Sequence, residues 1–323
     1  MNQTALRNNL VVLSGNSNPG LFKEICSYLK IAEGKASVER FPEGEIRVQI
    51  QQNIRGRDVF IVQSTCTPPN ERLMELLILV DAARRASASR VTAVLPFFGY
   101  ARQDRKDKPR VPITAKLVAN LIAVSGADRV LTMDLHAGQI QGFFDIPVDH
   151  LYSINVLGDY FRKKRLKNLV VVSPDVGGLK MARAYSKYLN ASLAIVDKRR
   201  ESERETHVMN IIGEVKDRNV LLVDDLISTG GSLVEAAKAL KKEGALDVYA
   251  AVVHPVLAGS AVEKVSQSVI RELVVTNTIP IPPGKQSPKI RVLSVAKLLA
   301  EAILRIHSNE SVSSLFAQSG VEA

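Results

Sequence analysis

Short apolar runs rich in β-branched residues recur along this chain, and the segments between them have the spacing of amphipathic helices. The runs are nearly continuous, as expected for parallel strands that helices cover on both faces. The strands expected from these runs are Leu10–Leu13, Asp58–Gln63, Val91–Leu95, Val130–Met133, Leu169–Val172, Leu193–Val196, Val220–Val223, Val248–Val253 and Leu273–Thr276. The alternation of strands and helices predicts an α/β architecture.

Local signals add a hairpin and two helix starts to this pattern. Ile46–Ile50 alternates apolar and polar residues, so we expect it in an edge hairpin. Asn70 is the expected N-cap of a helix, and Pro112 is the expected first-turn residue of another. The apolar stripe that the first of these helices should bury is Leu73, Leu76, Leu77 and Val80.

The chain of 323 residues is long enough for two folding units, and its halves resemble each other. A strand ends at Pro96 and meets Gly99 in the first half, and another ends at Pro174 and meets Gly177 in the second. This weak internal duplication predicts two similar domains. The expected boundaries are 1–147 for the first domain, 148–293 for the second, 294–316 for a helix that packs back on the first, and 317–323 for a frayed tail.

The net charge of +10 favours phosphorylated partners, because basic residues cluster at Arg102–Arg110, Arg162–Lys167 and Lys198–Arg204. Nucleic acid is one such partner, but aromatic residues make up only 5% of the chain and there is no Trp, so stacking platforms for bases are scarce. Small phosphorylated substrates fit the charge as well. For Arg162–Lys167 we prefer a solvated helix end. We therefore predict no nucleic-acid partner.

The two cysteines and the length of the apolar runs indicate where in the cell the protein is expected. Cys26 and Cys66 are far apart and lack the spacing of a metal site, so we expect two reduced, buried thiols. No apolar run approaches the roughly 18 residues that span a bilayer, and the first nine residues are polar, unlike a signal peptide. These features predict a cytoplasmic protein without a membrane partner.

The strongest chemical signal is VLLVDDLISTGGSL, residues 220–233. An apolar strand leads into Asp224 and Asp225, and a turn with hydroxyl groups and glycines, Ser228–Ser232, leads into a helix. Glycines let backbone amides face a ligand, and a helix start adds unpaired N–H groups and partial positive charge. Such a turn can bind a phosphate monoester, and the two carboxylates suit sugar hydroxyls, directly or through a metal. The alternative is a strand–helix turn that binds no ligand. That interpretation would be favoured if the segment contained only a Gly-Gly pair.

This segment resembles the phosphoribosyl-diphosphate motif of the type I phosphoribosyltransferase fold, and nearly the whole chain is similar to the ribose-phosphate diphosphokinases of the common phosphate-dependent class. The matching segments are RFPEGE (40–45), NERLMELLILVDAARRASA (70–88), GYARQDRK (99–106), MDLHAGQIQGFFDIPVDHL (133–151), SPDVGG (173–178), DKRR (197–200), ELVVTNTIP (272–280) and ESVSSLF (310–316). The resemblance implies two stacked type I phosphoribosyltransferase-like domains, each a mainly parallel sheet flanked by helices. It also implies a diphosphokinase that acts on ATP and ribose 5-phosphate in nucleotide biosynthesis.

The resemblance implies an ATP site in the first domain, with Phe41 stacked on adenine. The ATP-binding residues that it implies are Phe41, Glu43, Gly44, Glu45, Arg102 and Gln103. His136 and Asp175 are implied to lie near Mg²⁺ and the ATP phosphates. Asp175 is a natural ligand for a hard cation, whereas His136 is less natural, because Mg²⁺ prefers oxygen.

Lys198 and Arg200 are implied to be the catalytic pair, which neutralises charge while the anomeric hydroxyl attacks the β-phosphorus of ATP. The ribose 5-phosphate site would then contain Arg200, Asp224, Asp225, Ser228, Thr229, Gly230, Gly231 and Ser232. The family also implies a homo-oligomer, often a hexamer, in which residues near Arg102 complete a neighbour's ATP site, and it implies phosphate and ADP as effectors.

Two positions depart from the family pattern. After Arg200 the chain continues ESERETHV, where many members have a basic stretch with Pro and Asn, and Ser228 stands where many have Asp. The extra acidic residues motivate one alternative, a catalytically weak regulatory paralogue that assembles with active subunits. Another is a base-salvage phosphoribosyltransferase, which the ATP-side segments disfavour.

Overall fold

The computed structural model describes residues 9–199 and 208–315, and these form two compact units. The first unit contains the described residues up to Tyr152, together with Thr278–Pro280 and Val295–Leu315. The second unit contains the described parts of Ser153–Asn277 and Ile281–Ser294. The expected frayed tail, 317–323, lies outside the described residues.

The first unit is built on a parallel sheet. Its strands are, in order across the sheet, β1 (Leu10–Ser14), β4 (Asp58–Val62), β5 (Arg90–Leu95), β6 (Arg129–Met133) and β7 (Val148–Leu151). A separate antiparallel hairpin consists of β2 (Ala36–Arg40) and β3 (Ile46–Ile50), and β3 contacts a helix of the same unit, α3 (Pro69–Arg85). The expected hairpin at Ile46–Ile50 is therefore confirmed.

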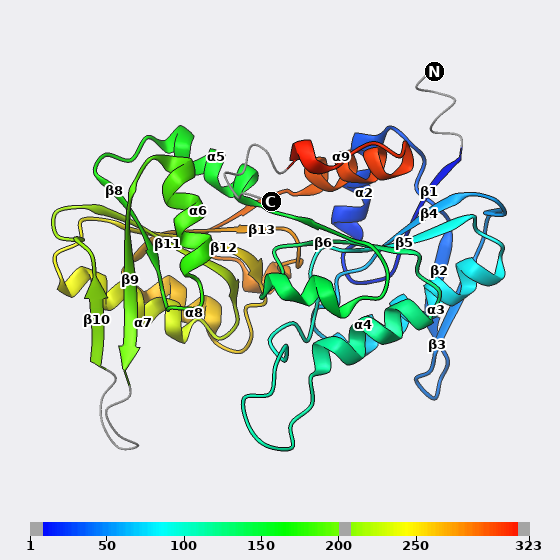
Figure 1. The fold of residues 1–323 in the computed structure, drawn as a ribbon, viewed down its shortest axis with the longest axis horizontal. Helices are drawn as coiled ribbons and strands as arrows, with labels where there is room; N and C mark the ends of the chain where they lie inside the picture. Colours follow the sequence, from blue (N-terminus) through cyan, green and yellow to red (C-terminus); the bar gives the residue numbers. More distant parts are fainter. Residues whose placement is uncertain (1–8, 200–207, 316–323) are drawn as a thin grey trace. The chain divides into compact units, whose positions relative to one another are not determined.

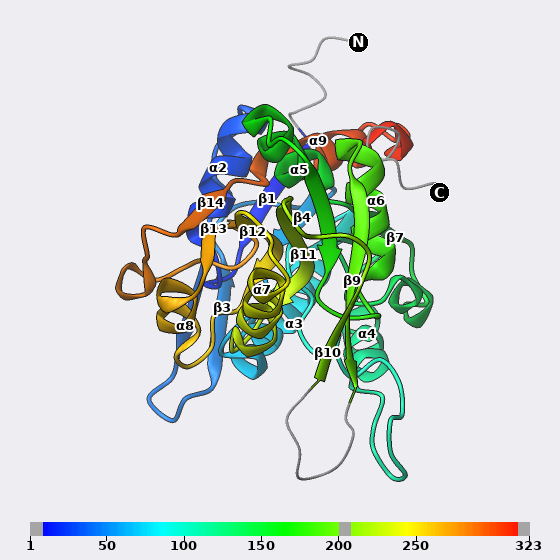
Figure 2. The ribbon, with the colours of Figure 1, turned by 90° about the vertical axis from the view of Figure 1, so that its left-hand side faces the viewer.

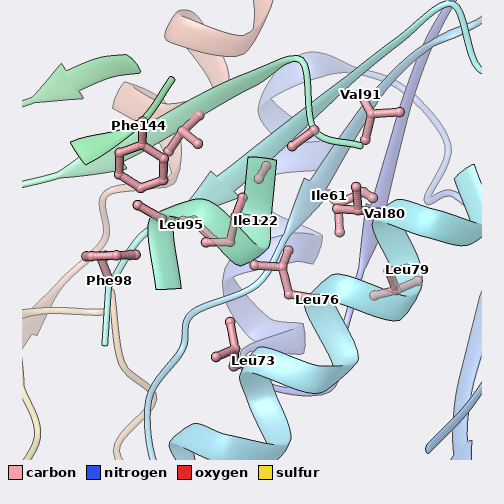
Figure 3. Close-up of a cluster of buried hydrophobic side chains, with 14 of the residues drawn as sticks. Ile61, Leu73, Leu76, Leu79, Val80, Val91, Leu95, Phe98, Ile122 and Phe144 are labelled. Atoms are coloured by element: carbon pink, nitrogen blue, oxygen red, sulfur yellow. The ribbon is translucent and has the colours of Figure 1, made fainter. Parts of the chain in front are cut away.

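Helices cover both faces of this sheet. On one side α2 (Pro19–Leu29) packs against α9 (Ala296–His307), and on the other side lie α3 and α4 (Thr114–Val124) (Figure 1). Figure 3 shows Leu76 and Val80 of α3 beside Ile61 of β4 and Ile122 of α4, and all four side chains are buried in one apolar cluster. Continuous apolar strands are needed here because neither face of the sheet contacts water.

The second unit has a larger, mainly parallel sheet. Its strands are, in order, β10 (Val208–Ile212), β9 (Ser192–Arg199), β8 (Leu169–Ser173), β11 (Asn219–Ile227), β12 (Val248–Pro255), β13 (Ile270–Thr276) and β14 (Ile290–Leu293). Only the β10–β9 pair is antiparallel among the described strand pairs of this sheet. Its helices α5 (Ile154–Lys164) and α6 (Leu179–Leu189) lie on one side, and α7 (Gly231–Lys242) and α8 (Ala261–Gln267) lie on the other (Figure 2).

Short 3₁₀ segments complete the described elements: η1 (Gly138–Phe143), η2 (Pro283–Lys285) and η3 (Ser313–Leu315). Every strand expected from an apolar run is present, whereas β2, β7, β10 and β14 were not anticipated. These four are short segments at the ends of sheets or in a hairpin, where less of the strand is buried and the apolar signal is weaker.

Both expected helix starts are wrong by a few residues. Helix α3 begins at Pro69, before Asn70, because proline at the first position lacks the N–H that would need a cap. Helix α4 begins at Thr114, beyond Pro112, and the N–H of Ala115 in its first turn donates to the carbonyl of Gln103 at 3.1 Å. A local proline thus accounts for the start of α3, and a contact outside the helix accompanies the start of α4.

Two further expectations concern the buried thiols and the solvated basic end of α5, and both agree with the structure. Cys26 and Cys66 are free and buried, and burial, with a contribution from Glu33, raises the pKa of Cys26 to about 12. Arg162 at the end of α5 forms an ion pair with Asp159 at 2.6 Å on the helix surface. None of the helices among the described residues is long and apolar enough to cross a membrane.

Candidate functional site

The carboxyl ends of β8 and β11 form a candidate ligand site in the second unit. These strands are parallel neighbours, and β9, the next strand in sequence after β8, lies on the opposite side of β8. Ligands of open α/β sheets bind at such a point, where the strand order reverses. Asp175 follows the end of β8, while Asp224 and Asp225 lie in the last part of β11.

Three carboxylates influence one another at this point. The pKa of Asp224 is raised to about 8, first by burial and then by the charges of Asp225 and Asp175. The N–H of Asp225 donates to the carboxylate of Asp224 at 2.9 Å, which opposes the rise only in part. Asp175 is exposed and accepts the N–H of Gly178 at 3.0 Å. An arrangement of this kind favours a bound cation or hydroxyl donors, because either would offset the carboxylate charge.

The predicted phosphate-binding turn connects β11 with α7. Strand β11 ends at Ile227 and α7 begins at Gly231, so Ser228, Thr229 and Gly230 form the connection. Gly230 has φ +74°, a left-handed backbone conformation that residues with a Cβ rarely adopt. The carbonyl of Ser228 accepts the N–H of Ala258 at 3.0 Å, which holds the start of the turn. The turn therefore ends at a helix N-terminus, whose free N–H groups suit a phosphate.

The predicted ATP residues of the first unit come from two segments. Phe41 to Glu45 form the turn between β2 and β3, in which the N–H of Phe41 donates to Glu45 and the N–H of Gly44 donates to Phe41, both at 2.9 Å. Gly44 has φ +99°. Glu43 and Glu45 are exposed. The ring of Phe41 is 41% exposed, and the guanidinium of Arg47 lies 5.8 Å from its centre. An exposed ring of this kind can stack on a base.

The second segment is the loop that follows β5. Arg102 is exposed there, and the side-chain oxygen of Gln103 accepts the hydroxyl of Thr114 at 2.5 Å. His136 is exposed and follows β6 after Asp134 and Leu135. All of these residues follow carboxyl ends of strands in the first unit, the side of a parallel sheet at which ligands bind.

Asp175 and His136 are the metal ligands that the family resemblance implies. They belong to different units. Within 9–199 and 208–315, there is no group of three or more His, Cys, Asp or Glu side chains that could hold a metal ion. Mg²⁺ usually binds through one or two carboxylates, several waters and substrate phosphates. The carboxylates of Asp175 and Asp224 fit that requirement, and the imidazole of His136 does not.

The predicted catalytic pair is described only in part. Lys198 lies in β9, where its backbone pairs with Met209 of β10. Its side chain, Arg200 and the acidic stretch up to residue 207 lie outside the described residues. Their arrangement therefore stays a prediction.

Sequence reasoning missed a polar cluster in the first unit that consists of Asn16, Ser17, Gln63 and Glu75. Gln63 and Glu75 are 0% and 2% exposed, and the side-chain N–H of Gln63 donates to Glu75 at 2.6 Å. The signal was present, because Gln63 directly follows β4 and Asn16 lies two residues beyond the end of β1. Polar residues just after an apolar run have the same significance here as Asp224 and Asp225 have in the second half of the chain.

Comparisons with known proteins identify relatives over nearly the whole chain. Residues 10–126 match the N-terminal domain of ribose phosphate pyrophosphokinase, and residues 200–317 match the phosphoribosyl synthetase-associated domain. The chain is 58% identical over 307 residues to a ribose-phosphate pyrophosphokinase of Rhizobium meliloti, covering 94% of this chain and 99% of the relative. It is 56% identical over 305 residues to one of Campylobacter jejuni, with 94% and 98% covered.

A solved structure gives the same result for the fold. The phosphoribosylpyrophosphate synthetase from Mycobacterium smegmatis matches with a TM-score of 0.89 and 40% identity, covering 93% of this chain and 99% of that chain. The expected type I phosphoribosyltransferase-like fold, with mainly parallel sheets flanked by helices, is thereby confirmed. On these matches, the chain belongs to the ribose-phosphate pyrophosphokinase family.

Proposed function

We propose that this chain transfers the β,γ-diphosphoryl group of Mg²⁺-bound ATP to the anomeric hydroxyl of D-ribose 5-phosphate. The products are 5-phospho-ribose 1-diphosphate and AMP, and the reaction serves nucleotide biosynthesis. The observation that best supports this function is the meeting of Asp175, Asp224, Asp225 and the turn Ser228–Ser232 at the strand-order reversal of the second unit. Near-full-length relatives with this activity in their names support it independently.

Ribose 5-phosphate occupies the second unit in this proposal. Its phosphate binds the turn from Ser228 to Ser232, where Gly230 and the start of α7 present N–H groups. Asp224 and Asp225 accept hydrogen bonds from the ribose hydroxyls, and Arg200 approaches the sugar. ATP occupies the first unit, with adenine on the ring of Phe41 and polar contacts from Glu43, Gly44, Glu45, Arg102 and Gln103.

Positioning and charge neutralisation account for most of the rate. Lys198 and Arg200 neutralise the migrating diphosphoryl group, so the sugar hydroxyl can attack in line with the departing AMP. Asp175, with His136 on the ATP side, orients the nucleotide phosphates. When bound, Mg²⁺ supplies positive charge to the phosphate oxygens. Asp175 and Asp224 would hold it, since both are oxygen donors whose charge it offsets.

We further propose a cytoplasmic homo-oligomer, a hexamer by family resemblance, in which the Arg102 loop completes a neighbour's ATP site. Phosphate and ADP are proposed effectors, and neither nucleic acid nor a membrane is a partner. The net charge of +10 then serves anionic substrates. The catalytically weak paralogue is not favoured, because the relatives that cover 94% of this chain are named as the enzyme.

The test is release of AMP by the purified protein with Mg²⁺, ATP and ribose 5-phosphate, with and without inorganic phosphate. We expect AMP and 5-phospho-ribose 1-diphosphate in equal amounts, formed faster when phosphate is present. Absence of AMP in both conditions would reject the enzyme. A base-salvage phosphoribosyltransferase would instead consume the sugar diphosphate together with a nucleobase. Supplying 5-phospho-ribose 1-diphosphate and a nucleobase to the purified protein, and measuring loss of the sugar diphosphate, tests this alternative.

A further inference from the structure

The first two turns of α3 contact both segments that we assign to ATP. We propose that these turns position the nucleotide-binding hairpin and the Arg102 loop, with Glu75 and Asn16 as positioning residues that do not touch ATP themselves. This inference rests on the proposed ATP site. The inference does not depend on the second unit, because all the residue contacts that support it lie within the first unit.

Glu75 is a buried carboxylate surrounded by donors. It is 2% exposed, and its two oxygens accept hydrogen bonds from three residues of different segments. The side chain of Gln63 donates at 2.6 Å, the guanidinium of Arg72 at 2.8 Å, and the side chain and backbone N–H of Asn16 at 3.1 and 3.3 Å. A buried carboxylate is costly unless its oxygens are satisfied, so this set of partners fixes one arrangement of the three segments.

Asn16 extends this arrangement to the hairpin. Its side-chain nitrogen donates to Glu75 and also to the carbonyl of Val38 in β2, the latter at 2.9 Å. Arg40, two residues after Val38 and at the end of β2, forms an ion pair with Glu71 in the first turn of α3. The turn that presents Phe41 thus begins directly after a strand that α3 holds directly through Glu71 and indirectly through Asn16.

The loop after β5 is held by the same end of α3. The hydroxyl of Tyr100 donates to the side chain of Asn70, and the N–H of Gly99 donates to the hydroxyl of Thr65 at 2.6 Å. Tyr100 has φ +65°, which is unusual for an aromatic residue and persists only where the surroundings hold it. The N–H of Gln103 donates to the carbonyl of Tyr100 at 2.9 Å, so the position of Tyr100 sets that of the proposed ATP residues.

Helix α3 itself is firmly held. Leu73, Leu76, Leu79 and Val80 line the side that packs on the sheet, and Figure 3 shows them with Ile61, Leu95 and Ile122. A packed helix cannot shift without disturbing this core. Its polar first turns are therefore a fixed reference for the two surface segments that they contact.

Asn16→Ala is the primary test, because Asn16 is exposed and its loss leaves the core intact. The measurement is the KM of ATP and of ribose 5-phosphate, together with kcat. We expect the ATP KM to rise about two- to tenfold, the range for the net contribution of one hydrogen bond, while the ribose 5-phosphate KM stays within about twofold. Asn16→Asp should have a larger effect, because its carboxylate would face Glu75 and the Val38 carbonyl.

Tyr100→Phe is the second variant, since it removes only the hydroxyl that donates to Asn70. The ATP KM should again rise with little change for the sugar. Asp81→Asn is the matched control, because Asp81 lies on the same helix in a surface pair with Arg85. It should leave both KM values unchanged. The thermal midpoint of each variant shows whether the fold is intact.

The outcomes separate the two proposals. An unchanged ATP KM in both Asn16→Ala and Tyr100→Phe would overturn the positioning role. So would an equal loss for both substrates that follows a lowered thermal midpoint, because that result indicates a purely structural effect. A wild-type protein that releases no AMP would reject the proposed function itself, and the positioning role with it.

Discussion

The Nδ1 atom of His307 lies 2.7 Å from the Oδ2 atom of Asp58, although 249 positions separate the two residues in sequence. Asp58 begins β4 and His307 ends α9, and their side chains are only 8% and 6% exposed. Arg90 donates to Asp58 at 2.9 Å through Nε and to the carbonyl of Ile306 at 2.9 Å. The pair therefore connects the last described α-helix to the amino end of the first sheet.

Asp58→Ala should lower the free energy of unfolding by about 3 kcal/mol at pH 7, because it leaves Arg90 and His307 without their buried partner. Urea unfolding followed by circular dichroism measures the change. Asp81→Asn removes a surface pair and should alter stability by less than about 0.5 kcal/mol. Equal stabilities of the two variants would contradict the role of the buried pair.

The carboxyl group of Asp58 predicts that the free energy of unfolding depends on pH. Burial by itself would raise the pKa of Asp58, but hydrogen bonds from His307 and Arg90 outweigh burial, so the pKa is lowered from its ordinary value. Such a group stabilises the fold above its unfolded pKa, about 3.9, and the stabilisation is lost as pH falls through the folded pKa. The difference between wild type and Asp58→Ala should therefore be complete above about pH 5 and shrink below about pH 4. A difference that widens in acid would show that this sign is wrong.

Phe41→Ala should raise the ATP KM about tenfold, because stacking on an aromatic ring contributes about 1–3 kcal/mol per base. The side chain is 41% exposed, so the thermal midpoint should hardly change. Steady-state kinetics with ATP varied provides the measurement. Phe41→Tyr keeps a ring and should behave like wild type. If both variants have a normal ATP KM, adenine binds elsewhere.

Lys198→Ala should reduce kcat by about 10²–10³, the usual cost of losing one charge-stabilising group at the transition state. Calorimetry should show little change in ribose 5-phosphate affinity, since the lysine acts on the migrating diphosphoryl group. Lys163→Ala, in the exposed basic end of α5, is the control and should retain full turnover. Near-normal turnover of Lys198→Ala would show that another cation performs this role.

Gly230→Ala should weaken ribose 5-phosphate binding about tenfold. The residue has φ +74°, and an L-residue with a Cβ pays about 1–2 kcal/mol for that conformation, so the turn would shift away from it. Gly284→Ala is the control, because a Cβ there meets nothing within 4 Å and no positive φ is involved. Calorimetric titration of both variants with ribose 5-phosphate tests the assignment, and equal affinities would argue against a phosphate in this turn.

The sequence by itself determined the strands with nearly continuous apolar runs in both sheets, and the segment from Val220 to Leu233. Strands buried on both faces require nearly continuous apolar runs, and a phosphate-binding turn brings its strand end, hydroxyls and glycines together within one contiguous segment. Features of this kind depend on neighbours in the chain. For that reason they are visible without any knowledge of the packing.

Only the tertiary structure decided the contacts between distant residues. Glu75 meets Asn16 across 59 positions and Asp58 meets His307 across 249, and no local pattern indicates either partner. The role of Asn70 likewise depends on the fold, since its side chain contacts Tyr100 instead of capping α3. A buried polar group takes whichever partner the fold brings within hydrogen-bond distance, and that choice is made only when helices and sheet come together.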